Sequence, residues 1–128
     1  MIRALLPKRG IDDWGSGAFG ASRGDRVHKG IDYECPVGAK VFSPVSGKVT
    51  KLGTCYKDDP FYRYVQISNT YDHRIFYVEP LVDIGYWVNE GSLIGICQDI
   101  QARYDKKMKN HVHYEVLDGG VPRNPEDG

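Results

Sequence analysis

Hydrophobic and polar residues alternate in short segments from residue 31 onward, and groups of turn-forming residues separate these segments. Alternation with a period of two is typical of β-strands that bury one face. The predicted strands are residues 31–35, 48–52, 62–68, 74–78, 92–96 and 111–117. Since a strand begins every ~8–12 residues, the pattern predicts an all-β fold, an antiparallel sandwich or a barrel-like sheet.

Turn chemistry supports this prediction. Pro36 and Gly38 end the first strand, residues 69–73 separate the two strands of a hairpin, and the Asn89-Glu-Gly91 turn places Gly91 where a positive φ is expected. The polar segment 98–110 is expected to be a loop. Residues 1–27 show neither a strand nor a helix period and are punctuated by glycine, so they are expected to be an irregular lead-in.

Composition limits the partners of the chain. Its 128 residues are enough for one domain, and 17 basic residues balance 17 acidic ones. No overall charge therefore favours nucleic acid. No apolar run approaches the ~20 residues of a membrane span, and the first residues lack the apolar core of a secretory signal. Three cysteines exclude a full disulfide framework, and no C-x-x-C pair is present for cysteine-rich zinc binding.

Histidines provide the candidate chemistry. Of the four, His111 and His113 are two apart in a predicted strand, so both imidazoles face one side of the sheet. His28 and Asp32 flank Gly30 at the first strand. Imidazole and carboxylate suit Zn²⁺. On spacing alone, structural roles for these residues remain open. The two strand histidines can be half-exposed polar residues, and Asp32 can be a carboxylate at the end of a strand. His73 falls in a predicted turn and is expected to face solvent.

The order of several motifs resembles the lysostaphin/LytM-type zinc endopeptidases. Residues 16–32 resemble the family's opening, with its F-G-x-R stretch before H-x-G-x-D. Residues 36–49 resemble its p-x-G-t-p-V-x-a-x-x-x-G-x-V segment, and residues 88–95 its V-x-x-G-x-x-I-G segment. His111-Val-His-Tyr-Glu115 resembles the terminal H-x-H motif. These matches run in order over most of the chain, and as an ordered set they are highly specific.

The resemblance implies a fold, a metal and a substrate class. It implies a duplicated hybrid motif fold with loops around a zinc groove, over residues 16–128, after an irregular lead-in of residues 1–15. It makes His28, Asp32 and His113 the Zn²⁺ ligands and His111 a catalytic histidine. The implied activity is hydrolysis of peptidoglycan cross-links or similar glycine-containing peptides, by a bacterial or phage protein acting on the cell wall.

One position departs from the family pattern. The second catalytic histidine of these enzymes lies two residues after the tyrosine of Y-x-H-L, where this chain has Glu79 after Tyr77. A carboxylate can act as a general acid or base, so Glu79 joins His111 as a catalytic candidate, but it is no cationic oxyanion donor. The leukocyte cell-derived chemotaxin branch of the fold also lacks this histidine. The alternative function is therefore a zinc-binding regulatory or ligand-binding module without turnover.

Overall fold

The computed structural model describes residues 22–23, 26–27, 30–104 and 108–125, and every regular element among them is a β-strand. The lead-in of residues 1–15 lies outside the described residues. The strands are β1 (Ser22–Arg23), β2 (Arg26–Val27), β3 (Ile31–Glu34), β4 (Lys40–Phe42), β5 (Gly47–Tyr56), β6 (Asp59–Ser68), β7 (Asp72–Phe76), β8 (Val78–Pro80), β9 (Trp87–Val88), β10 (Leu93–Cys97), β11 (His111–Asp118) and β12 (Val121–Arg123).

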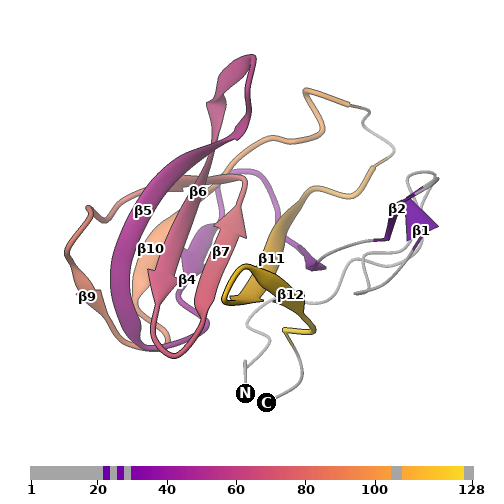
Figure 1. Cartoon of the computed structure of the whole chain (residues 1–128). Coiled ribbons are helices and arrows are strands. Elements are labelled where there is room, and N and C mark those ends of the chain that lie inside the picture. The colour runs from indigo at the N-terminus through magenta and orange to yellow at the C-terminus, as the bar shows by residue number, and fades with distance from the viewer. Residues whose placement is uncertain (1–21, 24–25, 28–29, 105–107, 126–128) are drawn as a thin grey trace.

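Two sheets form the body of the molecule. The larger sheet has the order β12-β11-β7-β6-β5-β9, with β3 paired to β11, and the smaller sheet has the order β4-β10-β8. All pairings are antiparallel. Figure 1 shows the larger sheet curling around β4 and β10, with the β5–β6 hairpin rising past its upper edge. The predicted all-β antiparallel fold is confirmed.

The main core lies where the two sheets face each other. Val65 and Ile67 of β6 are fully buried, and they meet Ile75 of β7, Tyr114 of β11 and Ile94 of β10 in one hydrophobic cluster. Burial of such apolar side chains provides most of the free energy that holds the sheets together, at roughly 25 cal/mol per Å². A smaller cluster of Tyr62, Ile100 and Met108 anchors the segment after β10.

The structure extends several of the predicted strands. β5 continues to Tyr56 and β6 begins at Asp59. Residues 53–61 therefore belong to a long hairpin that alternation alone did not predict. β9 and β12 were also not predicted, because two or three residues are too few for a period to appear. The prediction that residues 1–27 are wholly irregular is wrong in part, since β1 and β2 pair with each other. The Asn89–Gly91 turn is confirmed, with φ of 88° at Gly91.

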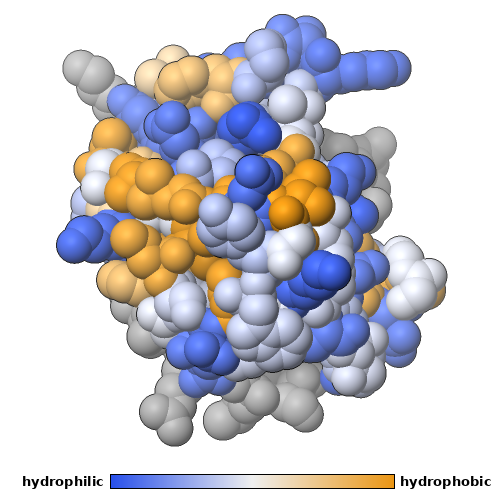
Figure 2. All heavy atoms as spheres, turned by 90° about the vertical axis from the view of Figure 1, so that its left-hand side faces the viewer, coloured by the Kyte–Doolittle hydropathy of each residue, from blue (hydrophilic) through white to orange (hydrophobic). Residues whose placement is uncertain are grey.

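Apolar side chains also lie on the surface. Figure 2 shows an apolar patch on the side of the molecule where β9 and β10 lie. In the segment from the end of β8 to β10, Leu81, Ile84, Trp87 and Leu93 are all exposed. No helix within the described residues is long and apolar enough to cross a membrane.

Candidate functional site

The register between β3 and β11 brings together two of the predicted zinc ligands. Asp32 lies directly opposite His113, although 81 residues separate them in the sequence. Nδ1 of His113 is 2.7 Å from Oδ1 of Asp32. Asp32 is only 2% exposed. Because an isolated buried carboxylate is costly, Asp32 is retained there only with partners of this kind.

His111 approaches the same carboxylate. It lies two residues before His113 on β11, so both imidazoles project from one face of the sheet, as predicted. Nε2 of His111 is 3.6 Å from Oδ2 of Asp32. Nδ1 of His111 is 2.8 Å from the carbonyl oxygen of Lys109. Since a carbonyl only accepts hydrogen bonds, Nδ1 carries a proton, and Nε2 is the ring nitrogen directed toward Asp32.

Glu115 completes a line of side chains on β11. Its Oε1 is 3.0 Å from Nε2 of His113, so the imidazole lies between two carboxylates. Burial of His113 opposes its charge, but the hydrogen bonds to Asp32 and Glu115 outweigh that effect and raise its pKa to about 9. These contacts favour the protonated, imidazolium form of the ring.

The packing around Gly30 explains why the H-x-G-x-D motif has a glycine at this position. Gly30 is buried against β11, and a Cβ built there would lie 2.3 Å from the carbonyl oxygen of Tyr114, 2.9 Å from Nε2 of His113 and 3.0 Å from Cγ of Glu115. Close approach to β11 and to the His113–Glu115 pair therefore allows no side chain at position 30.

These donors suit a zinc ion. One carboxylate and one imidazole nitrogen face each other, and Glu115 accepts from the far side of the same imidazole, as carboxylates commonly do behind metal-bound histidines. A cation at Nδ1 of His113 would replace the proton that the two carboxylates now require. The third predicted ligand, His28, lies outside the described residues. Within the described ranges no group of three His, Cys, Asp or Glu side chains is close enough to hold a metal.

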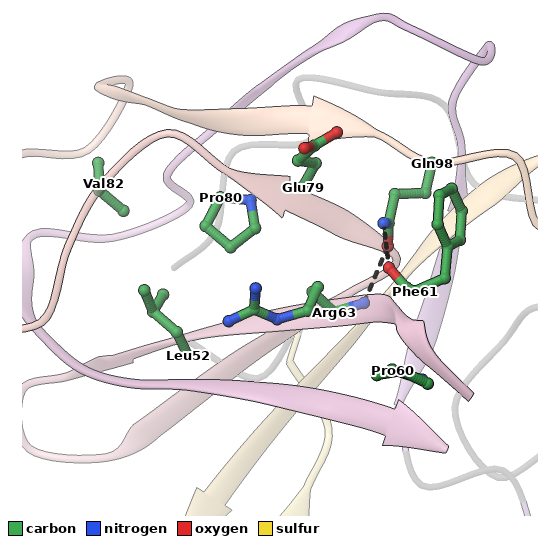
Figure 3. Close-up of a pocket in the computed structure, with 8 residues that line it drawn as sticks. All are labelled: Leu52, Pro60, Phe61, Arg63, Glu79, Pro80, Val82 and Gln98. Atoms are coloured by element: carbon green, nitrogen blue, oxygen red, sulfur yellow. Dashed lines mark hydrogen bonds between the residues drawn. The ribbon is translucent and has the colours of Figure 1, made fainter. Parts of the chain in front are cut away.

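Glu79 lies on a different surface from these histidines. It is exposed on β8 and lines a pocket of about 290 Å³ together with Arg63, Gln98 and apolar side chains of β5, β6 and the β8–β9 connection. Figure 3 shows Gln98 bridging the backbone of Arg63 and Phe61, with Glu79 across the pocket from Arg63. Within the described part of the chain, Glu79 makes no side-chain hydrogen bond.

Tyr77 is the residue of this segment that packs against His111. Its ring packs edge-on against His111, with centroids 5.5 Å apart. Its φ is 69°, the one left-handed value among the described non-glycine residues, and such a conformation costs roughly 1–3 kcal/mol. Burial raises the pKa of its hydroxyl, which stays protonated. The sequence did not place Tyr77 in the site, because tyrosine rarely adopts a left-handed backbone and its residue type therefore does not predict one.

The structure contradicts the prediction for His73. It was expected to face solvent from a turn, but it belongs to β7 and is only 5% exposed. Its Nδ1 is 2.6 Å from the hydroxyl of Tyr114 and its Nε2 is 3.0 Å from Oδ1 of Asn69. Burial lowers the pKa of His73 to about 4. A neutral imidazole that donates to Asn69 and accepts from Tyr114 satisfies both contacts, so His73 is a core residue.

Solved structures share this fold. Lysostaphin from Staphylococcus simulans matches with a TM-score of 0.68 at 17% identity, over 93% of this chain and 47% of that one. A mutant catalytic domain of the prophage-encoded M23 protein EnpA from Enterococcus faecalis matches with a TM-score of 0.67 at 20% identity, over 98% of this chain and all of that one. At these identities the likeness shows the fold alone.

Sequence relatives fall in two groups. The leukocyte cell-derived chemotaxin-2 of Mus musculus is 28% identical over 116 residues, 89% of this chain and 76% of the relative. The peptidoglycan DD-endopeptidase ShyC of Vibrio cholerae is 31% identical over 101 residues, 78% of this chain but only 22% of that enzyme. The model of peptidase family M23 matches residues 26–125, which hold the whole β3–β11 site. The chain therefore belongs to peptidase family M23.

Proposed function

We propose that this chain is a zinc metalloendopeptidase that hydrolyses peptide cross-links of peptidoglycan or similar glycine-containing peptides. The observation that carries the proposal is the buried Asp32–His113 pair, with His111 beside it on the same strand face. Family membership supports peptide hydrolysis, and the similarity to a peptidoglycan DD-endopeptidase supports a cell-wall substrate outside the cytoplasm. Asp32 and His113, with His28, are the proposed ligands.

The chain's own residues have separable tasks in this mechanism. A zinc ion held by Asp32, His113 and His28 would supply a Lewis acid to activate water and polarise the scissile carbonyl. His111 keeps its proton on Nδ1 through the Lys109 carbonyl, so its Nε2 is the base that takes a proton from the attacking water and passes it to the leaving amine. Glu115 fixes the ring of His113 by accepting from Nε2. Glu79 lines a separate pocket, so its proposed acid–base role requires a substrate that reaches both this pocket and the histidines.

Two measurements test the proposal. Metal analysis of the purified protein is expected to find one zinc per chain, lost in His113→Ala but kept in His73→Gln, because His73 is hydrogen-bonded within the core. Incubation with purified peptidoglycan or a pentaglycine peptide is expected to give cleavage that His111→Ala or a chelator abolishes. A zinc-loaded wild type that leaves both substrates intact contradicts the peptidase.

Two observations favour a second function. Position 79 has no histidine, and the leukocyte cell-derived chemotaxin-2 of Mus musculus, which is 28% identical to this chain, is not named as an enzyme. The alternative is therefore a zinc-binding module that recognises a ligand without turnover. It predicts a zinc-loaded wild type that binds cell-wall peptide and leaves it uncleaved.

A further inference from the structure

The left-handed residue at position 77 changes which side chains face His111 and His113. Phe76 lies beside His113, with ring centroids 5.3 Å apart. In a regular strand the next side chain would point to the opposite face. The positive φ at Tyr77 breaks the alternation, so Tyr77 joins Phe76 on the side of the histidines, Val78 enters the core and Glu79 points out to solvent. One backbone conformation thus puts Tyr77 beside the histidines, where a regular strand would place Val78.

The backbone of Tyr77 is fixed on both sides. Its N–H donates to the carbonyl of Arg63 on β6 at 2.8 Å, and its carbonyl accepts from the N–H of Gln98 at 2.9 Å. The unusual conformation is therefore part of the hydrogen bonding between the two sheets and is not a frayed end. The surrounding structure over-determines the position of the ring, which is the condition under which a strained residue persists.

A chain of hydroxyl groups extends from this ring. The hydroxyl of Tyr77 is 3.3 Å from that of Tyr56, which is 2.7 Å from that of Tyr104 in the loop after β10. The guanidinium of Arg103 lies over the ring of Tyr56 at 3.7 Å and pairs with Asp59 at 3.0 Å. The β5–β6 hairpin, the loop and Tyr77 are thereby joined into one wall beside His111.

We propose that Tyr77 is a positioning residue for His111, held in place by its hydroxyl contact through Tyr56 to Tyr104. The inference rests on the proposed function for its effect on rate. Edge-to-face packing restricts rotation of the imidazole, in addition to its hydrogen bond from Nδ1 to the Lys109 carbonyl. An oriented Nε2 is what a general base requires, and a misplacement of ~1 Å can cost ~10²-fold in rate.

Two substitutions separate the ring from its hydroxyl. Tyr77→Asn removes the ring but keeps a residue type that tolerates a left-handed backbone, so the fold is retained. Tyr77→Phe keeps the ring and removes its anchor. Tyr86→Phe is the matched control, because Tyr86 is exposed between β8 and β9. Zinc content and thermal midpoint are measured for each variant before any rate.

For the zinc-loaded protein, kcat on a pentaglycine peptide is expected to fall about 10- to 100-fold in Tyr77→Asn and less in Tyr77→Phe, at constant KM. Tyr56→Phe should resemble Tyr77→Phe. The imidazole resonances of His111, followed by NMR in the same samples, are expected to shift in Tyr77→Asn and to stay in place in Tyr86→Phe.

The two readouts keep this inference distinct from the peptidase proposal. If the wild type cleaves and Tyr77→Asn keeps its kcat within twofold, the positioning role is overturned while the peptidase stands. If the wild type cleaves nothing, the peptidase fails, and the NMR spectra decide: displaced His111 resonances in Tyr77→Asn support the contact, and unchanged ones overturn it.

Discussion

Gly30 is the single residue on which the approach of β3 to the histidine strand most depends. Gly30→Ala is expected to lower the free energy of unfolding by about 2–3 kcal/mol, because the new methyl group meets backbone and the His113–Glu115 pair. The same variant should bind zinc more weakly, since His113 must move. Chemical denaturation and metal analysis measure both effects.

Gly38→Ala is the control for Gly30→Ala. Gly38 has a φ of 82°, but a Cβ there meets no atom within 4 Å. This variant should lose only the ~1 kcal/mol of a left-handed alanine and keep its zinc. Equal losses of stability and of zinc in both variants would contradict a steric role for Gly30.

His73 makes the stability of the protein depend on pH. Burial lowers its pKa to about 4, with Asp72 opposing and Arg123 reinforcing that shift, whereas the unfolded chain titrates near 6.5. The unfolded state therefore binds the proton first as pH falls, and the stabilisation present above pH 6.5 is lost between pH 6.5 and 4. From pH 7 to pH 5 the loss should be about 2 kcal/mol.

The measurement is a comparison of urea unfolding curves at several pH values for the wild type and His73→Gln. The difference between the two proteins isolates His73 from the other histidines. A difference that stays constant from pH 7 to pH 4 would show that His73 titrates normally in the folded protein.

At the scale of elements, Asn110 holds the loop between β10 and β11. Its Nδ2 donates to the carbonyls of Cys35 and Gln98, at 2.8 and 3.0 Å, and its Oδ1 accepts from the N–H of Ile100 at 2.9 Å. Asn110→Ala leaves these backbone groups without their partner and should cost about 2 kcal/mol or more.

Hydrogen exchange locates that effect. The amide of Ile100 should lose protection in Asn110→Ala while the amide of Ile67, in the centre of β6, keeps its relative protection. Because His111 follows Asn110 directly, the variant should also lose peptidase activity. Uniform loss of protection across the sheets would mean that Asn110 stabilises the whole fold and not this loop.

The sequence predicted the strands in which hydrophobic and polar residues alternate regularly. Alternation in residues 62–68 and 111–117 predicted β6 and β11, and the H-x-H spacing predicted that His111 and His113 share a face. It did not predict β9 or β12, which are too short for a period, or the burial of His73, which depends on Tyr114 across the sheet. Local pattern also gave no sign that Tyr77 would lie beside His111, because its left-handed backbone depends on hydrogen bonds to β6 and to Gln98.

At the scale of the whole molecule, the proposed metal links strands distant in sequence. A ligand that binds only the folded state stabilises it by mass action, by about 4 kcal/mol when its concentration is a thousand times Kd. Zinc is therefore expected to raise the thermal midpoint of metal-free protein, and a chelator should reverse the change. Asp32→Ala should abolish the response to zinc, whereas Tyr86→Phe should keep it. A midpoint that zinc does not move would contradict the site.

The direct pairing of Asp32 with His113 makes the ion a check on assembly. If β3 joined β11 one residue out of step, the carboxylate and the imidazole would point to opposite faces, and no cation would join them. Refolding with zinc present should therefore favour the correctly paired chain over its slipped competitors. The proposed metal would then also select the correct strand pairing while the protein folds.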